Sequence, residues 1–351
     1  MPTPSVGSRA GCYNLRTMDS KDIIAALFAD GKGILAADES SETATKRLGA
    51  VGVESTVETR RLYRELFFEC PGANAYISGV IFYDETWWQK SSDGQSYPEY
   101  LAAHGILPGI KVDQGLAAFG DHGETVTLGI EGLAERLDAY AASGARFTKW
   151  RAAIAVDPIR QTPTAECLKE NARRMAAYAK LVTARGMVAI CEPEVLMDGD
   201  HTAAQAEAAI GAALDALFAE LSAAGVPLSG VVLKTAMALP GKDSDEVEPV
   251  REVAVMTVRA LKAHCPADLA GVVLLSGGQG PRLATSHLDA IADHGPLPWP
   301  VAYSYARAIQ EEALKAWAGK PENVDAARLA LHHRLKLLAA ADRGQYDPNQ
   351  D

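Results

Sequence analysis

Eight short apolar runs alternate with longer amphipathic stretches, and this alternation restricts the fold more than any other feature of the 351-residue chain. The runs cover 33–38, 75–82, 109–113, 145–151, 187–192, 230–234, 271–276 and 301–304. Helical periodicity marks 57–69, 131–142, 164–185, 203–224, 247–263 and 308–318, and near the chain ends 20–29 and 323–341. Parallel strands need long crossover connections, usually helices, so the pattern predicts an α/β fold with a parallel sheet.

The number of strand–helix units favours a closed (β/α)₈ TIM barrel over an open doubly wound sheet. An open sheet would normally carry a glycine-rich turn after its first strand, and the chain has neither GxGxxG nor a Walker A sequence. We therefore predict one barrel domain over residues 1–351, with an N-terminal segment at 1–18 and a C-terminal helix and tail at 320–351.

The charge and the cysteines restrict the partners and the compartment. A net charge of −11 disfavours nonspecific binding to nucleic acid and to anionic membranes. The N-terminus lacks the apolar core of a signal peptide, and no apolar run approaches membrane length. The five cysteines (Cys12, Cys70, Cys167, Cys191 and Cys265) are scattered and form no CxxC pair. We expect a cytoplasmic protein that binds neither nucleic acid nor membrane and has no disulfide framework.

Polar side chains stand at the carboxyl ends of most of the predicted strands, where barrel enzymes hold their catalytic groups. They are Asp38, Lys111, Lys149, Arg151, Glu192, Glu194, Lys234, Ser276, Ser304 and Arg307. Because all strands of a parallel barrel end at the same mouth, we expect these side chains to form one site.

Lys234 ends the apolar run VVLK, with no carboxylate close to it in the sequence. Such a lysine could simply extend from the strand end into solvent. Burial and a neighbouring cation, for which Lys149 is the candidate, both lower the pKa of a lysine and make it a nucleophile for carbonyl groups. Lys149 could equally pair with Glu192, and the two readings are compatible. The sequence thus raises the hypothesis of a Schiff base at Lys234.

Two further motifs suit this chemistry. Glu192 and Glu194 lie two residues apart in an extended ICEPE segment, so they would face the same side and keep one proton between them. One of them could then act as the acid that dehydrates a carbinolamine. The segment LLSGGQG follows the seventh strand, where barrels commonly bind phosphate through backbone N–H groups. Gly277 and Gly278 would supply the backbone and Arg307 a bidentate fork, although a double glycine can also be only a turn.

These residues closely resemble class I fructose-bisphosphate aldolase, the metal-independent type that works through a Schiff base. The resemblance runs from about residue 15 to about residue 345. It includes GILAADES (33–40), KRL (46–48), GIKVD (109–113), KWR (149–151), EPE (192–194), Lys234, LSGGQ (275–279), SYAR (304–307) and ALKAWAGK (313–320).

The resemblance implies reversible cleavage of fructose 1,6-bisphosphate to dihydroxyacetone phosphate and glyceraldehyde 3-phosphate, without a cofactor or metal, by a homotetramer. Lys234 would form the imine, Glu192 would dehydrate the carbinolamine, and Asp38 would take the C4 hydroxyl proton with help from Lys149. Glu194 and Arg151 would support them. The 1-phosphate would lie at Ser276, Gly277, Gly278, Ser304 and Arg307, and the 6-phosphate end and hydroxyls at Ser40, Thr43, Lys46, Arg47 and Lys111.

The chain departs from the family pattern in three places. Thr235 and Ala236 follow the lysine where Pro-Asn is common, and Glu42 stands where glycine is frequent, so its carboxylate would point away or weaken phosphate binding. The tyrosine-ended tail of animal members is missing, as in a bacterial-like member, and Tyr346 is no obvious substitute.

Several alternatives without a metal stay open at this stage. A transaldolase-like or sedoheptulose-bisphosphate aldolase and a phosphosugar isomerase would share the fold, as would a noncatalytic sugar-phosphate-binding protein. A metal-dependent aldolase is disfavoured, because it would need clustered histidines, and His201 near Asp198 and Asp200 is better explained as part of a loop before a helix cap.

Overall fold

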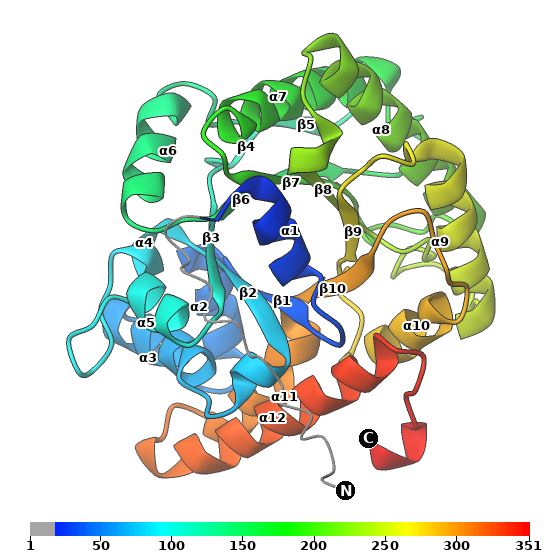
Figure 1. Cartoon of the computed structure of the whole chain (residues 1–351). Helices are drawn as coiled ribbons and strands as arrows, with labels where there is room; N and C mark the ends of the chain where they lie inside the picture. The colour runs from blue at the N-terminus through cyan, green and yellow to red at the C-terminus, as the bar shows by residue number, and fades with distance from the viewer. Residues whose placement is uncertain (1–17) are drawn as a thin grey trace, which may run out of the picture.

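A computed structural model describes residues 18–351, and its centre is a closed barrel of eight parallel strands (Figure 1). Around the barrel the strands follow the order β1-β10-β9-β8-β7-β6-β3-β2. They are β1 (Gly33–Ala37), β2 (Ile77–Phe82), β3 (Leu107–Lys111), β6 (Phe147–Ile154), β7 (Val188–Val195), β8 (Val231–Thr235), β9 (Gly271–Leu274) and β10 (Val301–Tyr305). The predicted TIM barrel is confirmed, and each predicted strand overlaps an observed one. Residues 1–17, with Cys12, lie outside the described part of the chain.

Twelve α-helices lie within residues 18–351; α1 crosses one end of the barrel, and the others surround it, most of them between successive strands (Figure 1). They are α1 (Ser20–Leu27), α2 (Ser41–Gly49), α3 (Val57–Phe68), α4 (Asp84–Trp87), α5 (Tyr97–Ala103), α6 (Leu133–Ala142), α7 (Ala165–Thr183), α8 (Ala203–Ala223), α9 (Val250–His264), α10 (Pro281–Ala292), α11 (Arg307–Trp317) and α12 (Val324–Ala341). Short 3₁₀ turns occupy Ala73–Ala75, Leu228–Gly230, Pro321–Asn323 and Pro348–Gln350. Within residues 18–351 no helix is both long and apolar enough to cross a membrane.

Helices α2, α4 and α10 and the hairpin of β4 and β5 were not predicted from the sequence. Helix α2 is polar and short, and its start is defined by the Ser40 side chain, which accepts a hydrogen bond from the Thr43 N–H. Helix α10 buries Ala284, Leu288 and Ile291, a spacing that does signal a helix in retrospect. Strands β4 (Leu116–Phe119) and β5 (Glu124–Thr127) form an antiparallel hairpin after β3, too short and exposed to stand out as apolar runs.

The barrel interior is packed by inward-facing side chains and closed at one end by α1. Ile23 and Leu27 of α1 join an inner apolar cluster that includes Phe147, and α1 crosses the barrel end in Figure 1. Phe147 fits because β3 carries a glycine opposite it: a Cβ on Gly109 would lie 2.2 Å from its ring. The closed end leaves the opposite end, where the strands terminate, as the open mouth of the barrel.

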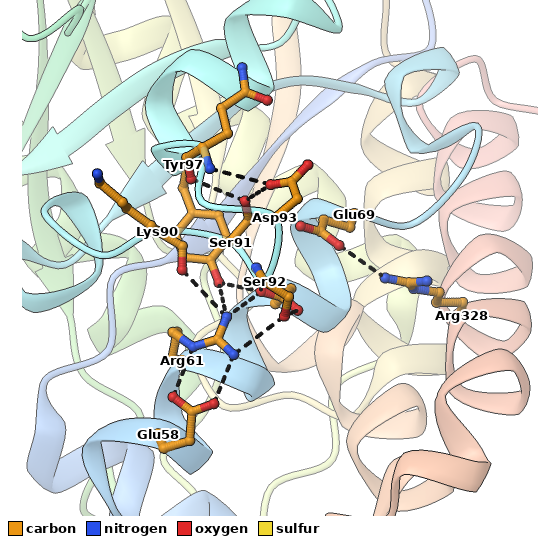
Figure 2. Close-up of polar contacts among 11 residues, drawn as sticks. Glu58, Arg61, Glu69, Lys90, Ser91, Ser92, Asp93, Tyr97 and Arg328 are labelled. Carbon is orange, nitrogen blue, oxygen red and sulfur yellow. Dashed lines mark hydrogen bonds and ion pairs between the residues drawn. The ribbon is translucent and has the colours of Figure 1, made fainter.

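A polar network on the outer side of α3 fixes the loop between α4 and α5 (Figure 2). Arg61 pairs with Glu58 and Glu65 and donates to the Tyr97 hydroxyl at 3.0 Å. Glu65 in turn accepts hydrogen bonds from the Ser92 hydroxyl at 2.6 Å and from the Tyr97 hydroxyl at 2.8 Å. The network joins α3 to the loop before α5 and so holds α3 in place. Helix α3 also carries Arg64, which contacts Glu39 at the barrel mouth.

Asp342, at the end of α12, lies beside an apolar cavity of about 210 Å³ on another part of the surface. Its Oδ1 atom is buried and has no hydrogen-bond partner in the described part of the chain. Burial raises the pKa of this carboxyl to about 7 from its usual 3.8. An acid whose pKa is higher in the folded state destabilises the fold progressively as the pH rises from its unfolded to its folded pKa.

We expect Asp342→Asn to stabilise the protein by about 2 kcal/mol at pH 8 and to leave it nearly unchanged at pH 4. Three pKa units correspond to about 4 kcal/mol, and we halve this because part of the side chain contacts solvent. Urea unfolding at both pH values measures the effect. Asp325→Asn, in the exposed first turn of the same helix, is the control and should show no gain at pH 8. A loss of stability at pH 8 would contradict the prediction.

Candidate active site

One cavity of about 450 Å³ opens at the carboxyl ends of the barrel strands and collects all but one of the predicted site residues. The predicted residues that line it are Asp38, Ser40, Thr43, Arg47, Lys111, Lys149, Arg151, Glu192, Glu194, Lys234, Ser276, Gly277, Gly278, Ser304 and Arg307. Lys46 is the exception, because its side chain is 75% exposed and its Nζ lies 2.8 Å from Glu42. Glu42 points away from the cavity in this pair, one of the two outcomes expected for it.

Four ionisable groups meet at the bottom of the cavity. Lys149 of β6, Glu192 of β7 and Lys234 of β8 come from adjacent strands, and Asp38 follows β1 on the other side of the barrel. Lys149 Nζ lies 2.7 Å from Asp38 Oδ2 and 2.8 Å from Glu192 Oε2. Lys234 Nζ lies 2.9 Å from Glu192 Oε1. The side chains of both lysines are at most 4% exposed, so Lys234 does not extend into solvent.

The electrostatic balance of this cluster keeps its carboxylates charged. Burial raises the pKa of Asp38 and of Glu192, but attraction by Lys149 and Lys234 outweighs it and holds both pKa values below their usual range. Burial likewise lowers the pKa of Lys149, while Asp38 and Glu192 raise it above the ordinary lysine value. The two lysines are not the directly repelling neighbours expected from the sequence, because Glu192 lies between them and contacts both.

Glu194 has a different partner from the one expected. It pairs with Arg151 of β6 at the rim, and the guanidinium balances its charge. The backbone N–H of Arg151 donates to Asp113 Oδ2 at 3.3 Å, which fixes the β6 side of the cavity. Glu192 is therefore the carboxylate next to Lys234, whereas Glu194 holds the Arg151 guanidinium at the cavity wall.

The glycine turn after β9 has the geometry of an anion site. Gln279 N donates to Ser276 O at 2.9 Å, and Gly277 and Gly278 adopt φ values of +54° and +92°, which residues with a Cβ rarely adopt. Arg307, the first residue of α11, donates to Gly278 O at 3.1 Å. Ser304 Oγ is buried beside the cavity and has no hydrogen-bond partner within 18–351, so this hydroxyl is free for a ligand.

The opposite wall carries a second set of cations. Lys111 Nζ lies 2.5 Å from Asp113 Oδ1, and the Arg47 guanidinium donates to both Glu39 and Gln310. Ser40 and Thr43 lie at the start of α2, with their hydroxyl oxygens 3.2 Å apart. The cavity thus has basic groups at two separated ends and the lysine–carboxylate cluster between them.

Sequence reasoning missed several residues that hold these cations in place. Glu39 is 8% exposed and accepts hydrogen bonds from Arg47 and from Arg64, an arginine of α3 that is only 2% exposed. Asp113 holds Lys111, as described above. Glu39 and Asp113 stand inside the GILAADES and GIKVD motifs, which could have revealed them, whereas Arg64 and Gln310 come from helices with no local signal.

The alternative metal site does not form in the described part of the chain. No group of three or more His, Cys, Asp and Glu residues between 18 and 351 could hold a metal ion. His201 is 1% exposed, and the neighbouring Asp198 pairs instead with Lys242 of the loop after β8.

Comparison with known proteins shows which family the chain is similar to. Residues 19–351 match the family model of the glycolytic class-I fructose-bisphosphate aldolases. A probable fructose-bisphosphate aldolase class 1 of Xanthomonas campestris pv. campestris is 44% identical over 323 residues, which cover 92% of this chain and 96% of the relative. The cytosolic fructose-bisphosphate aldolase 4 of Arabidopsis thaliana is 43% identical over 90% of this chain and 80% of its own.

A solved structure shares the fold as well. It is the fructose-bisphosphate aldolase of Plasmodium falciparum, crystallised with TRAP and a small-molecule inhibitor. It superposes with a TM-score of 0.91 at 39% identity, over 93% of this chain and 95% of that chain. The chain therefore belongs to the class I fructose-bisphosphate aldolase family, a family of carbon–carbon lyases.

Proposed function

We propose that this protein reversibly cleaves fructose 1,6-bisphosphate to dihydroxyacetone phosphate and glyceraldehyde 3-phosphate through an imine at Lys234. The observation that carries the proposal is the buried contact of Lys234 Nζ with Glu192 at 2.9 Å, inside a cavity with cations at both ends. Two basic ends suit a substrate with two phosphates better than the monophosphates of transaldolases.

Imine formation requires a nucleophilic amine and an acid–base group. Glu192 takes a proton from the Lys234 ammonium, and the free amine then attacks the C2 carbonyl of the open-chain ketose to give a carbinolamine. Glu192 returns the proton to the C2 hydroxyl, which leaves as water as the C=N bond forms. The contact between the two side chains supports this exchange, because no rearrangement is needed to bring donor and acceptor together.

Cleavage follows from the electron demand of the protonated imine. Asp38 takes the C4 hydroxyl proton, C4 becomes the aldehyde of glyceraldehyde 3-phosphate, and the C3–C4 electron pair moves into the iminium as an enamine. Lys149 contacts both Asp38 and Glu192, so its ammonium stabilises the negative charge of each carboxylate when that group has given up its proton. Protonation of the enamine at C3 and hydrolysis of the imine release dihydroxyacetone phosphate and regenerate Lys234.

The remaining predicted residues would bind the substrate ends. Ser276, Gly277, Gly278, Ser304 and Arg307 take the 1-phosphate, supported by the turn geometry and the unpaired Ser304 hydroxyl. Ser40, Thr43, Arg47 and Lys111 take the 6-phosphate end, with Glu194 and Arg151 orienting the wall between them. For Lys46, a role requires that it leave Glu42 and turn toward the cavity.

We also propose that the protein acts in glycolysis and gluconeogenesis in the cytoplasm, as a homotetramer and without a cofactor. The glycolytic family and the cytosolic Arabidopsis relative support the setting, although a relative from Chlamydomonas reinhardtii is chloroplastic. Light scattering of the purified protein tests the assembly.

Borohydride reduction in the presence of fructose 1,6-bisphosphate tests the mechanism directly. The reagent reduces the imine to a stable secondary amine, so we expect irreversible loss of activity and a substrate-derived mass on the peptide that contains Lys234. Full activity after treatment, or an adduct on another residue, would refute the assignment.

Replacing Arg307 with alanine tests the 1-phosphate end. We expect the KM for fructose 1,6-bisphosphate to rise by about 30-fold, equivalent to about 2 kcal/mol of lost charge-assisted hydrogen bonding. Imine trapping with unphosphorylated dihydroxyacetone should be nearly unchanged, because that ligand has no phosphate to lose. Equal losses for both compounds would contradict the assignment of Arg307.

A further inference from the structure

Behind the glycine turn that lines the cavity lies a buried polar pair that the proposed reaction does not use. Gln279, the last residue of the turn, is 3% exposed, and His287 of α10 is 1% exposed. His287 Nδ1 lies 2.5 Å from Gln279 Oε1. Neither side chain lines the cavity, so neither can contact a substrate there.

The orientation of the Gln279 amide determines which nitrogen of His287 carries the proton. The Gln279 amide nitrogen donates to Met237 Sδ at 3.5 Å, so its oxygen faces His287 and Nδ1 must carry the proton. Burial lowers the pKa of His287 to about 4, which leaves the imidazole neutral at physiological pH. His287 Nε2 is buried without a partner among the described residues, so the bond to Gln279 is the one polar contact that the ring makes there.

The turn is therefore held from two sides. On the cavity side Arg307 binds the Gly278 carbonyl, and on the far side Gln279 is tied to α10 through His287 and to the loop after β8 through Met237. Met237 lies three residues after Lys234, so the same glutamine bridges the turn and the segment that follows the imine lysine. Gly277 and Gly278 cannot stiffen the turn themselves, because glycine has the largest conformational freedom of any residue.

We propose that His287 and Gln279 are positioning residues for the C1 phosphate: their hydrogen bond fixes the 276–279 turn so that its N–H groups and the Ser276 hydroxyl face the ligand. This inference rests on the proposed function. It assigns a role to α10, an element behind the cavity wall, and it separates affinity for the phosphate from reactivity of the lysine.

The test compares dihydroxyacetone phosphate with dihydroxyacetone in borohydride trapping at Lys234, with the concentration for half-maximal trapping as the readout. The double variant Gln279→Met/His287→Leu replaces both polar partners by apolar side chains of similar size, a change that is nearly neutral for stability. We expect half-maximal trapping to need about tenfold more dihydroxyacetone phosphate, because a tenfold change in affinity corresponds to the net contribution of about one hydrogen bond. The value for dihydroxyacetone and the melting temperature should be nearly unchanged.

Two further variants sharpen the result. His287→Asn places an amide N–H near the position of Nδ1. The concentration of dihydroxyacetone phosphate for half-maximal trapping should therefore stay within about threefold of the wild-type value. Ser286→Ala, on the same helix, removes a hydroxyl that bonds to the Arg282 carbonyl and to Tyr346, both outside the turn, and should change neither value. If the double variant does not fold, His287→Leu alone carries the same comparison.

The outcomes separate this inference from the proposed function. Unchanged trapping of dihydroxyacetone phosphate by the variants, or equal losses for both ligands, would overturn the positioning role while leaving the mechanism intact. A wild-type protein that is labelled at Lys234 by neither ligand would overturn the proposed function and this inference with it.

Discussion

Replacing Lys234 with methionine is expected to lower kcat for fructose 1,6-bisphosphate cleavage by at least about 10⁴-fold, because the covalent route is lost entirely. Methionine is unbranched and of similar length, so it fits the buried position without an amine. Glu192 keeps its contact with Lys149, so the carboxylate is not left unpaired and the variant should fold. Steady-state cleavage and borohydride trapping, measured on the same preparation, give the two readouts.

The matched control is Lys315→Met, which removes a lysine paired with Glu311 on the exposed side of α11. Its activity should equal that of the wild type, since surface ion pairs contribute little to stability. More than about 1% of wild-type activity in Lys234→Met would mean that another group can act as nucleophile, and the imine assignment would fail.

Lys149→Met is expected to weaken both catalysis and stability, because this ammonium holds two buried carboxylates. Asp38 loses the one ion-pair partner that it has within residues 18–351, while Glu192 keeps Lys234. Removing one member of a buried ion pair costs about 3–5 kcal/mol, and losing a preorganised charge at a reacting centre costs about 10²–10³ in kcat. Urea unfolding and steady-state kinetics measure the two effects.

The pH dependence of the stability loss follows from the direction of the pKa shifts. In the wild type the pKa values of Asp38 and Glu192 are lowered, so their stabilising contribution is full above the unfolded values of about 4 and is lost as the pH falls through the folded values. Removing Lys149 takes away the largest attraction on Asp38 and leaves the burial that raises its pKa opposed only by Lys234 and Lys111, so the pKa of Asp38 rises and the variant gains less stability than the wild type as the pH increases. The gap between the two proteins should therefore be widest at pH 8 and smaller at pH 4, and it should close only as the pH falls below 4 through the lowered folded values of the wild type.

Lys242→Met is the control for this stability effect. The Lys242 and Asp198 side chains that form its ion pair are both more than half exposed, so its loss should leave the free energy of unfolding nearly unchanged at either pH. A gap between Lys149→Met and wild type that does not change with pH would contradict the ion-cluster explanation.

The barrel itself was predictable because its signals are local and repeated. Each strand is a short apolar run, and β6 or β8 can be recognised without knowing what packs against it. The hairpin β4–β5 was missed for the opposite reason, since it lies on the surface and half of β4 is exposed. Helix α2 was missed because its polar sequence depends on the Ser40 cap and on the barrel mouth beneath it.

The membership of the site was also predictable, because strands that run parallel around a barrel must all end at one mouth. Asp38 and Lys234, 196 positions apart in the sequence, were expected in one cavity for that reason, and both line it. Lys46 shows the limit of the argument. Its neighbour Arg47 faces the cavity, and a one-residue step along α2 turns Lys46 outward to Glu42.

The sequence by itself determined which reactive side chains stand at the strand ends and where the double glycine falls. It also determined the likeness of these motifs to an aldolase. Only the tertiary structure decided which charges meet. Glu192 lies between Lys149 and Lys234, Glu194 turns to Arg151, and the turn at Gln279 is tied to His287 from behind. Ion pairs and hydrogen bonds depend on separations of about 3 Å, and the barrel sets these distances by bringing together strands and helices that are remote in the chain.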